Sequence, residues 1–239
     1  MALPAVHKRS WALALARGYA RRTLRRRIDG VHIIGIDNVR DAVARGPLLF
    51  AANHVSWWDA FALVVVDEAL GTDGFVLMEE ANLRRLPFFS ALGALAIDLQ
   101  HPRRAVLQLQ QAAHLLRGPR RALWIFPQGE QRPARAPLQF RRGVVHLAAR
   151  ARCPVVPVSI QLLWRRQPVP TLVIGLHPPL ELEGSELVSA LERQIAHDFE
   201  DFEDRAARNT LPPAWVPGRS RSAERGVGAR VLAHLQGAP

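Results

Sequence analysis

Cysteine and long apolar runs are scarce in this sequence, and their scarcity excludes several protein classes. One cysteine, Cys153, stands among 239 residues, so an internal disulfide framework is impossible and a reducing compartment is expected. The longest apolar runs, residues 60–66 and 11–16, fall far short of the ~18 residues that span a bilayer. The run at 11–16 is also too short for a secretory signal, and Arg17 follows it where small residues are required. We therefore expect neither a membrane-spanning helix nor a secretory leader.

Acidic residues are nearly absent from both ends of the chain. Of the net charge of +11, residues 1–30 contribute +7 (eight basic against one acidic) and residues 205–239 contribute +5 (six against one). Residues 31–204 contribute −1, with 18 basic and 19 acidic residues. A nucleic-acid enzyme more often spreads its charge over the folded face and interleaves aromatic residues, whereas the C-terminal segment offers only Trp215. We therefore expect no nucleic-acid partner.

The N-terminal surplus of charge lies on an expected helix. Within residues 10–28, Trp11, Leu15 and Tyr19 recur at helical spacing, and arginines fill many of the remaining positions. A basic amphipathic helix of this kind suits the headgroups of anionic lipids, where each basic residue adds ~1 kcal/mol. Residues 1–30 are therefore expected to bind a membrane surface, which makes this a peripheral protein at the cytoplasmic face of the membrane. The alternative is a helix whose Trp/Leu stripe packs on the folded domain.

The middle of the chain, residues 31–208, alternates short apolar runs with segments of helical periodicity. Strands are expected at 31–36, 47–53, 74–79, 94–99, 122–127, 154–163 and 171–176, and helices at 58–70, 82–92, 103–116, 142–152 and 185–208. Several strands lack polar alternation, so both faces of the sheet should be covered. This order predicts one α/β domain with a mostly parallel, mixed sheet flanked by helices. Residues 209–239, rich in Pro, Gly and Arg, are expected to form a weakly ordered tail, with a short helix near Val231 as one option for its end.

The stretch "ANHVSWWD" (52–59) carries the first candidate for chemistry. His54 and Asp59 follow an apolar strand, at the strand-to-helix turn where α/β folds bind their ligands. An imidazole takes a proton from a hydroxyl efficiently when a carboxylate holds its second ring nitrogen and fixes the tautomer. Asp59 is five residues away across a turn and can fold back to do this. The alternative is an Asp59 that caps the following helix beside a hydrogen-bonded core histidine.

Further motifs follow in a fixed order: "GALAID" (93–98), "FPQGEQR" (126–132), "LQFRRG" (138–143) and "VVPVSI" (155–160). Together with "NHVSWWD" (53–59), this set resembles the glycerolipid acyltransferase family, that of the 1-acylglycerol-3-phosphate acyltransferases and their lysophospholipid acyltransferase relatives. "NHVSWWD" matches the family's Asn-His-x4-Asp block, and the other four motifs resemble Gly-x-x-Phe-Ile-x-Arg, Phe-Pro-Glu-Gly-Thr-Arg-Ser, Leu-x-x-Phe-Lys-x-Gly and a last, Pro-containing strand. The resemblance covers roughly residues 46–162.

The resemblance implies that an acyl chain passes from acyl-CoA, or acyl carrier protein, to the hydroxyl of a lipid acceptor. The acceptor would be a lysophospholipid such as 1-acylglycerol 3-phosphate, with His54 as general base and Asp59 as its orienting partner. The residues that would support the motifs are Asn53, Phe126, Pro127, Gln128, Gly129 and Glu130. No metal or cofactor is expected, because the thioester is already activated and the nine histidines show no ligand cluster. Cys153 begins a buried strand and is not expected to act as a nucleophile.

Trp57 and Trp58 lie between the two candidate catalytic residues. They would contact the acyl chain or the lipid acceptor where it meets His54. The alternative is ordinary packing between the following helix and the sheet, and each ring can serve a different purpose.

Two departures from the family pattern concern the acceptor. Gln128 replaces Glu, Glu130 replaces Thr, and the arginine of that motif comes one place late, at Arg132; Leu99 replaces the arginine of the second motif. The family uses these two arginines to hold the acceptor phosphate through charge-assisted hydrogen bonds. The candidate replacements are Arg103, Arg104, Arg132 and Arg135.

The departures leave other functions open. The acceptor could be a lipid alcohol without a phosphate, such as a glycosylated carotenoid, a glycolipid or an amino-acid lipid. A non-catalytic membrane-surface module is a further alternative, against which the intact His54 and Asp59 argue. Donor chain length, the choice between CoA and carrier protein, and the oligomeric state do not follow from the sequence.

Overall fold

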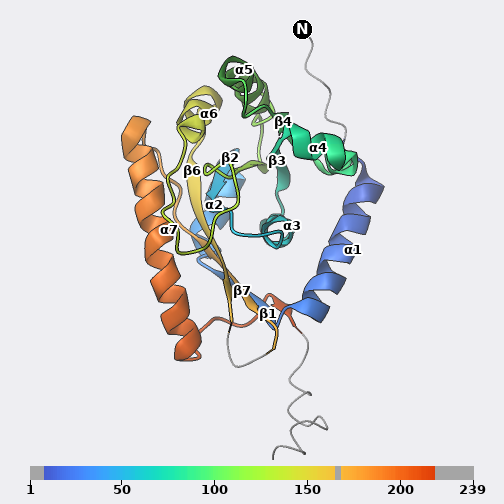
Figure 1. The fold of residues 1–239 in the computed structure, drawn as a ribbon, viewed down its shortest axis with the longest axis vertical. Helices are drawn as coiled ribbons and strands as arrows, with labels where there is room; N and C mark the ends of the chain where they lie inside the picture. The colour runs from blue at the N-terminus through green and yellow to red at the C-terminus, as the bar shows by residue number, and fades with distance from the viewer. Residues whose placement is uncertain (1–7, 165–167, 219–239) are drawn as a thin grey trace, which may run out of the picture.

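The computed structural model describes residues 8–164 and 168–218, and these residues form one mixed sheet with helices on both faces (Figure 1). The strands of the described residues are β1 (Gly30–Ile34), β2 (Leu48–Ala52), β3 (Asp73–Glu79), β4 (Ala94–Ile97), β5 (Arg121–Ile125), β6 (Val155–Leu163), β7 (Thr171–Leu176) and β8 (Val216–Pro217). Their order is β4-β3-β5-β2-β6-β7-β1-β8. The five strands from β4 to β6 are mutually parallel, whereas β7 is antiparallel to β6 and β8 is antiparallel to β1. The predicted α/β class with a mostly parallel, mixed sheet is confirmed.

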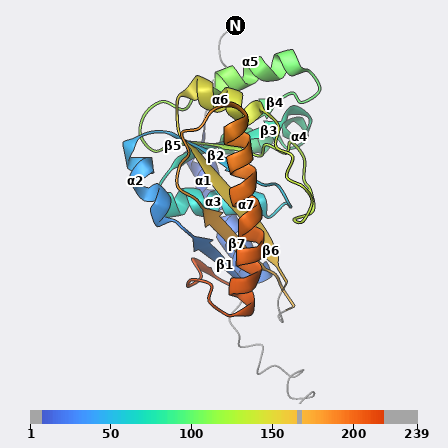
Figure 2. The same cartoon turned by 90° about the vertical axis from the view of Figure 1, so that its left-hand side faces the viewer.

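Both faces of the sheet are covered, as the unbroken apolar runs require. Every residue of β2 is buried, and alternate side chains face opposite layers. Leu48 and Phe50 belong to a core with α1, α2 and α3, whereas Leu49 and Ala51 belong to a core with α5, α6 and α7. The helices are α1 (Ser10–Arg27), α2 (Asp37–Arg45), α3 (Asp59–Leu70), α4 (Glu80–Arg85), the 3-10 helix η1 (Pro87–Leu92), α5 (Pro102–Ala113), α6 (Gly143–Ala151) and α7 (Gly184–Ala207). Turned by 90°, the molecule shows α7 lying across the front of the sheet (Figure 2).

The seven strands and most helices lie where the sequence predicts them, but three segments differ. The helix expected at 82–92 is broken into α4 and η1 at Pro87, which has no N–H to donate and disfavours the helical conformation of the residue before it. The short helix α2 was not predicted, since only Val39, Ala42 and Val43 mark its buried face. Residues 216–217, expected in a weakly ordered tail, form β8 on the edge of β1.

The C-terminal segment up to Gly218 is held by backbone hydrogen bonds. The Trp215 N–H donates to the Val31 carbonyl at 2.7 Å, and the Val216 side chain is buried against the core of α1–α3. Pairing with the edge strand β1 holds this segment in place, although its composition predicts a weakly ordered tail. The short helix considered near Val231 lies outside the described residues.

Helix α1 packs on the domain through a different stripe from the one that the sequence suggests. Ala20 and Leu24 are buried, and Ile28 at its C-terminal end is fully buried in the core with the sheet. Trp11 and Leu15 lie away from the domain and are exposed, whereas Tyr19, although exposed, has its ring 6.2 Å from that of Phe61 in α3. The stripe that the sequence suggests therefore contacts the domain through Tyr19, whereas α1 packs mainly through Ala20, Leu24 and Ile28.

Polar contacts also hold α1 in place. Arg21 forms a two-bond ion pair with Glu68 of α3, with N···O distances of 2.6 and 3.1 Å. Lys8, just before α1, lies 2.5 Å from an Asp73 carboxylate oxygen and 3.8 Å from the centroid of the Phe75 ring. The helix is thus part of the folded unit at both of its ends. No helix in the part of the chain that the structure describes combines the length and apolarity needed to cross a bilayer.

Asp67, near the end of α3, is a partly buried carboxylate that joins this helix to the sheet. Its Oδ1 accepts hydrogen bonds from the Thr72 hydroxyl at 2.6 Å and from the Trp124 indole at 3.1 Å. Burial raises the pKa of Asp67 to about 6, because these two hydrogen bonds only partly offset the loss of solvation.

Candidate active site

The predicted site residues gather at one edge of the sheet. Strands β4, β3, β5 and β2 are parallel neighbours, so their carboxyl ends meet at this edge, about 4.8 Å apart from strand to strand. His54 follows β2, the Phe126–Gly129 turn follows β5, and Asp98 follows β4. This is the edge at which parallel α/β sheets bind their ligands.

His54 and Asp59 form a dyad. The Nδ1 atom of His54 lies 2.6 Å from Asp59 Oδ2, so a proton on Nδ1 is donated to the carboxylate and the lone pair of Nε2 is left available. The Asp59 carboxylate also accepts the backbone N–H groups of Val55 (2.7 Å) and Ser56 (3.0 Å) and the Ser56 hydroxyl (3.3 Å). Four hydrogen bonds and the N-terminus of α3 stabilise its negative charge. The loop backbone thus binds the Asp59 carboxylate, and this carboxylate orients the imidazole of His54.

The geometry speaks against the capping alternative. The N-cap residue of α3 is Trp58, and no side chain caps this helix end; Asp59 is already inside the helix and faces back to the loop. The Asp59 side chain is 1% exposed, whereas that of His54 is 25% exposed. A buried carboxylate beside a partly accessible imidazole is the arrangement that a general base needs.

The "FPQG" turn holds the backbone of His54 on both sides. The His54 N–H donates to Gln128 Oε1 at 2.6 Å, and the His54 carbonyl accepts the backbone N–H of Arg132 at 2.9 Å. The ring of Phe126 stacks on the imidazole with centroids 4.3 Å apart. Gln128 is buried, and its amide oxygen supplies the acceptor that a glutamate would supply at this position. Replacing Glu by Gln therefore preserves the link between the two motifs.

Asn53 fixes the end of β2 from the other side. Its side chain is fully buried, and its amide group donates to the Ile160 carbonyl at 2.8 Å and accepts the Ile160 N–H at 2.7 Å. This fork joins β2 to β6 where their own ladder ends. Contacts that could support His54 are therefore found for Asn53, Phe126 and Gln128, whereas Glu130 pairs with Arg132.

The two tryptophans of the motif have different environments. Trp58 is partly buried, packs on the core, and lies 5.4 Å from Phe61 between ring centroids. Trp57 is 65% exposed, although it is a large apolar ring close to His54 in the chain. Packing accounts for Trp58, whereas Trp57 is available to a ligand.

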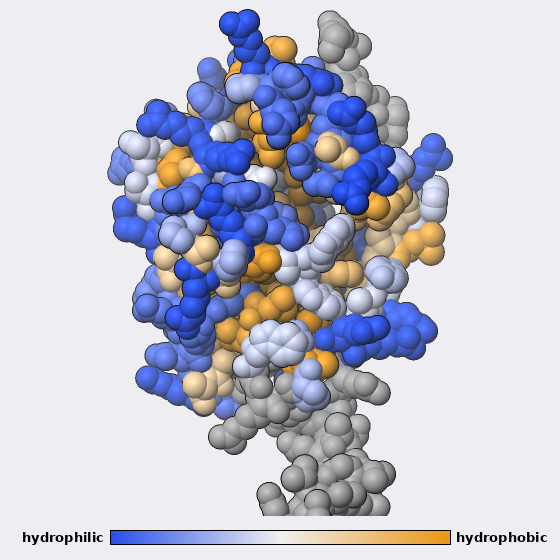
Figure 3. Space-filling model, viewed as in Figure 1, coloured by the Kyte–Doolittle hydropathy of each residue, from blue (hydrophilic) through white to orange (hydrophobic). Residues whose placement is uncertain are grey.

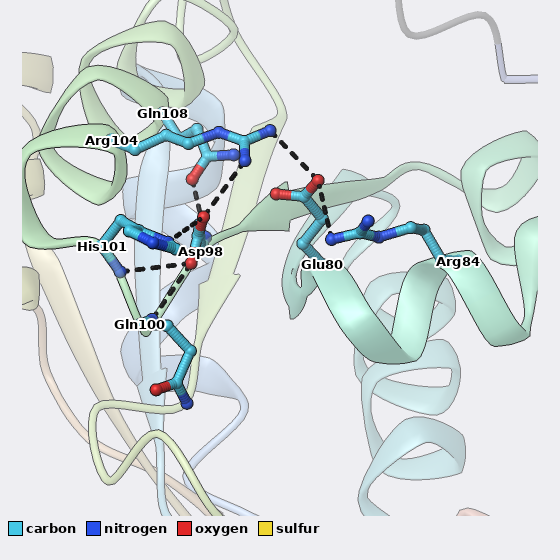
Figure 4. Close-up of polar contacts among 7 residues, drawn as sticks. All are labelled: Glu80, Arg84, Asp98, Gln100, His101, Arg104 and Gln108. Atoms are coloured by element: carbon cyan, nitrogen blue, oxygen red, sulfur yellow. Dashed lines mark hydrogen bonds and ion pairs between the residues drawn. The ribbon is translucent and has the colours of Figure 1, made fainter.

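Arg104 lies in a charged network at the end of β4 (Figure 4). Its guanidinium group bridges Asp98 and Glu80, with an N···O distance of 3.1 Å to each, and Arg84 contacts the same Glu80 at 3.2 Å. Burial works against ionisation of Asp98, but hydrogen bonds from His101 and nearby backbone groups lower its pKa below the ordinary value. A phosphate at Arg104 would have to displace carboxylates that already neutralise it.

The other predicted phosphate-binding arginines differ in their surroundings. Arg132 donates to Glu130 at 2.8 and 3.1 Å and to Gln139 at 2.6 Å. Arg135 pairs with Glu203 of α7. Arg103 is exposed and has no hydrogen-bond or ion-pair partner among the described residues. A phosphate at Arg132 or Arg135 would therefore compete with an acidic side chain.

One residue at this edge was not predicted. The guanidinium group of Arg141 lies over Gly129 in the "FPQG" turn, and the Arg141 N–H donates to the Pro127 carbonyl at 2.9 Å. The position of Arg141 within "LQFRRG", where the family pattern has Lys, was a signal that could have marked it.

The remaining candidates for chemistry lie elsewhere or are inert. Burial raises the pKa of Cys153 to about 12, so its thiol is held in the protonated form at neutral pH. Within residues 8–164 and 168–218, no group of three or more His, Cys, Asp or Glu side chains is arranged to hold a metal ion.

The chain is similar in sequence to known acyltransferases. The family model described as acyltransferase matches residues 30–161, which is more than half of the chain. Three curated proteins named 1-acyl-sn-glycerol-3-phosphate acyltransferase are similar to it. The protein from Saccharomyces cerevisiae is 29% identical over 136 residues, which are 54% of this chain and 42% of that protein. The protein from Escherichia coli is 24% identical over 186 residues (70% of this chain and 74% of that protein), and the one from Limnanthes alba is 30% identical over 142 residues (54% of this chain and 49% of that protein). The match thus spans less than half of the length of two of these relatives.

A solved structure shares the fold. The crystal structure of the 1-acyl-sn-glycerophosphate acyltransferase PlsC from Thermotoga maritima superimposes with a TM-score of 0.57, at 19% identity, over 79% of each chain. At this identity the similarity concerns the architecture of the sheet and its helices.

Proposed function

The chain belongs to the glycerolipid acyltransferase family, and we propose that it transfers a fatty acyl group from a thioester donor, acyl-CoA or acyl carrier protein, to the hydroxyl of a lysophospholipid. An acceptor such as 1-acylglycerol 3-phosphate is favoured by the names of its relatives. The observation that carries the proposal is the contact of 2.6 Å between His54 Nδ1 and Asp59 Oδ2.

The proposed reaction uses His54 twice. The acceptor hydroxyl gives its proton to His54 Nε2 while its oxygen bonds to the carbonyl carbon of the thioester. The carbon–sulfur bond then breaks, the ester forms, and the departing thiolate takes the proton back from Nε2. Asp59 holds the Nδ1 proton throughout and stabilises the imidazolium that exists between the two transfers. Because the thioester is already activated, we propose that neither a metal ion nor another cofactor takes part.

Trp57 is proposed to contact the acyl chain or the acceptor lipid. It is the exposed ring of the pair, and burying a side chain of this size against an acyl chain is favourable. The face of the molecule in Figure 3 is hollowed near the middle of the view, with apolar surface along part of the hollow. Apolar surface at this place suits a lipid substrate.

Helix α1 is proposed to attach the protein to the cytoplasmic face of an anionic membrane. Its exposed stripe carries Trp11 (60% exposed), Leu15 (66%) and Tyr19 (65%) and continues toward the C-terminus with exposed arginines at 22 and 26. Apolar and aromatic side chains fit the interface between acyl chains and headgroups, and guanidinium groups fit the phosphates. The stripe is available because α1 uses its other side to pack on the domain.

The test is direct assay of the purified full chain. Acyl-CoA and lysophosphatidate are supplied in anionic vesicles, and phosphatidate is detected by mass spectrometry, with a neutral monoacylglycerol as the alternative acceptor. Phosphatidate formation supports the proposal. Turnover of the neutral acceptor alone would indicate a lipid alcohol without a phosphate, and turnover of neither with any thioester would reject the enzymatic function.

A further inference from the structure

Three of the four arginines that the sequence suggests for phosphate binding are paired with acidic side chains, and Arg103 alone among them has no such partner in the described residues. Arg132 is held by Glu130 and Gln139, and Arg104 is held by Asp98 and Glu80. These guanidinium groups are neutralised, so neither offers an uncompensated charge to a ligand. Arg141 resembles Arg103 in being exposed and in having no hydrogen-bond or ion-pair partner for its guanidinium group among the described residues, but it is Arg141 that lies against the "FPQG" turn.

The Arg141 side chain lies against the turn that holds the catalytic histidine. A side chain on Gly129 would place its Cβ 3.0 Å from Arg141 Cζ and 3.1 Å from Nε and Nη1, so the guanidinium occupies the space that this glycine leaves. The backbone of Gly129 is left-handed, with φ of 74°, so glycine suits the turn as well as the close contact. Phe126 and Gln128 of the same turn contact the His54 ring and its backbone N–H. Arg141 therefore stands beside the residues that position His54.

The surroundings of Arg141 favour an anion. The next element is α6, whose first turn contains no acidic residue, so its N-terminus adds positive potential. A guanidinium presents N–H groups in a fork that matches two phosphate oxygens. Glu130, where the family pattern has Thr, neutralises Arg132. A second cation is then needed if the site is to bind phosphate.

We propose that Arg141 is the phosphate-binding residue of this active site, in the role that the family pattern assigns to the arginine of the "FPQG" motif. The inference rests on the proposed function, which supplies two sources of phosphate close to His54. One is the phosphate monoester of a lysophosphatidate acceptor, and the other is the phosphate groups of coenzyme A in the donor. Both offer the same chemistry to the guanidinium group.

The test compares Arg141→Ala with Arg142→Ala in the full chain. Arg142 is a matched control because it is the adjacent arginine, is exposed, and has no ion-pair partner within the described ranges. Binding is measured by phosphorus NMR titration with two probes, glycerol 3-phosphate and coenzyme A, after circular dichroism has shown equal folding. Arg141→Ala should weaken binding of at least one probe by about 10–150-fold, whereas Arg142→Ala should not. Arg141→Lys, which keeps the charge but not the fork, should recover part of the loss.

The two probes separate the sources. Selective loss of glycerol 3-phosphate binding, with a raised KM for lysophosphatidate and unchanged hydrolysis of acyl-CoA, identifies the acceptor phosphate. Selective loss of coenzyme A binding, with normal hydrolysis of a phosphate-free acyl thioester, identifies the donor. Wild type that binds neither probe, or an Arg141→Ala variant that matches Arg142→Ala with both, overturns the inference. Phosphate binding that depends on Arg141 in a protein without acyl transfer rejects the proposed function and leaves the phosphate site standing.

Discussion

Asp59 binds the backbone of its loop as well as the imidazole, so a change at either residue of the dyad must be measured for activity and for folding separately. His54→Ala removes the base without touching the loop hydrogen bonds and should lower acyl transfer about 10²–10⁴-fold. Asp59→Asn should lower it by a comparable factor, because an amide no longer enforces the tautomer that leaves Nε2 free. Thioester consumption is measured on variants with equal circular dichroism. Most of the activity remaining in His54→Ala would exclude His54 as the base.

Gln128 offers a matched pair of substitutions. Gln128→Ala leaves the His54 N–H without its acceptor inside a buried turn, so the imidazole should shift and kcat should fall by as much as about 10²-fold. Gln128→Glu keeps an acceptor oxygen at this place and should retain most of the activity. The two variants are compared by kcat and KM, because misplacement of the base lowers kcat more than it raises KM. Equal kcat for Gln128→Ala and wild type would show that this hydrogen bond does not position His54.

At the residue scale, sequence reasoning succeeds where partners are close in the chain. His54 and Asp59 are five residues apart, and one turn suffices to join them. Two of the arginines predicted for the acceptor site have distant partners instead: Arg135 meets Glu203, and Arg104 meets Glu80, only after the chain has folded. The free state of Arg141 could not be predicted for the same reason, since it reflects the absence of a carboxylate in three dimensions.

The two sides of α1 carry leucines with opposite surroundings, which gives a test at the scale of the element. Leu24 is fully buried in the core, so Leu24→Ala should lower the free energy of unfolding by about 2–5 kcal/mol. Leu15 is 66% exposed, and Leu15→Ala on the same helix should change it by no more than about 0.5 kcal/mol. Urea unfolding followed by circular dichroism measures both. Similar effects of the two substitutions would contradict the packing of α1.

The exposed stripe of α1 can be altered while Ala20, Leu24 and Ile28 are left in place, and the contact with the domain that changes is that of the Tyr19 ring with Phe61. Serines in place of Trp11, Leu15 and Tyr19 should greatly reduce sedimentation with anionic vesicles, because they remove the apolar contact with the interface. Salt at about 0.5 M should weaken binding of the intact protein by screening the arginines. Leu107→Ser, at an exposed leucine of α5, is the control. Undiminished binding of the triple variant would show that another surface attaches the protein to vesicles. Deletion of residues 1–28 is not a suitable test, because it also removes Leu24 and Ile28 from the core.

Helices and strands could be predicted from the sequence where the spacing of apolar residues along the chain determines them. The seven longer strands are apolar runs bounded by turn residues, and α7 repeats its buried side chains at helical spacing. The nine-residue α2 has too few apolar positions for a clear pattern. The two-residue β8 has no local signal of its own, because it is defined by pairing with an edge strand far away in sequence.

For the whole molecule, the partly buried Asp67 makes stability depend on pH. Its pKa is about 6 in the folded state against an ordinary value of 3.8, so the folded state binds the proton more tightly. Its contribution to stability is therefore fully present below pH 3.8 and is lost as the pH rises through about 6, by up to about 3 kcal/mol. Asp67→Asn keeps an acceptor for Thr72 and Trp124 and cannot ionise. Urea unfolding at pH 4.5 and 7.5 should show a smaller loss of stability in this variant than in wild type, and equal losses would contradict the assignment.

Lys8 is the only lysine of the chain, and its side chain is 13% exposed, ion-paired with Asp73 and placed over the Phe75 ring. The folded protein therefore presents almost no side-chain amine to a reagent, although it carries 31 arginines. Amine-directed cross-linking, dye labelling or surface coupling will act mainly at the amino terminus while the segment before α1 stays docked. Modification of Lys8, detected by mass spectrometry of its peptide, would therefore show that this segment has separated from the sheet, and no mutation is needed for the measurement.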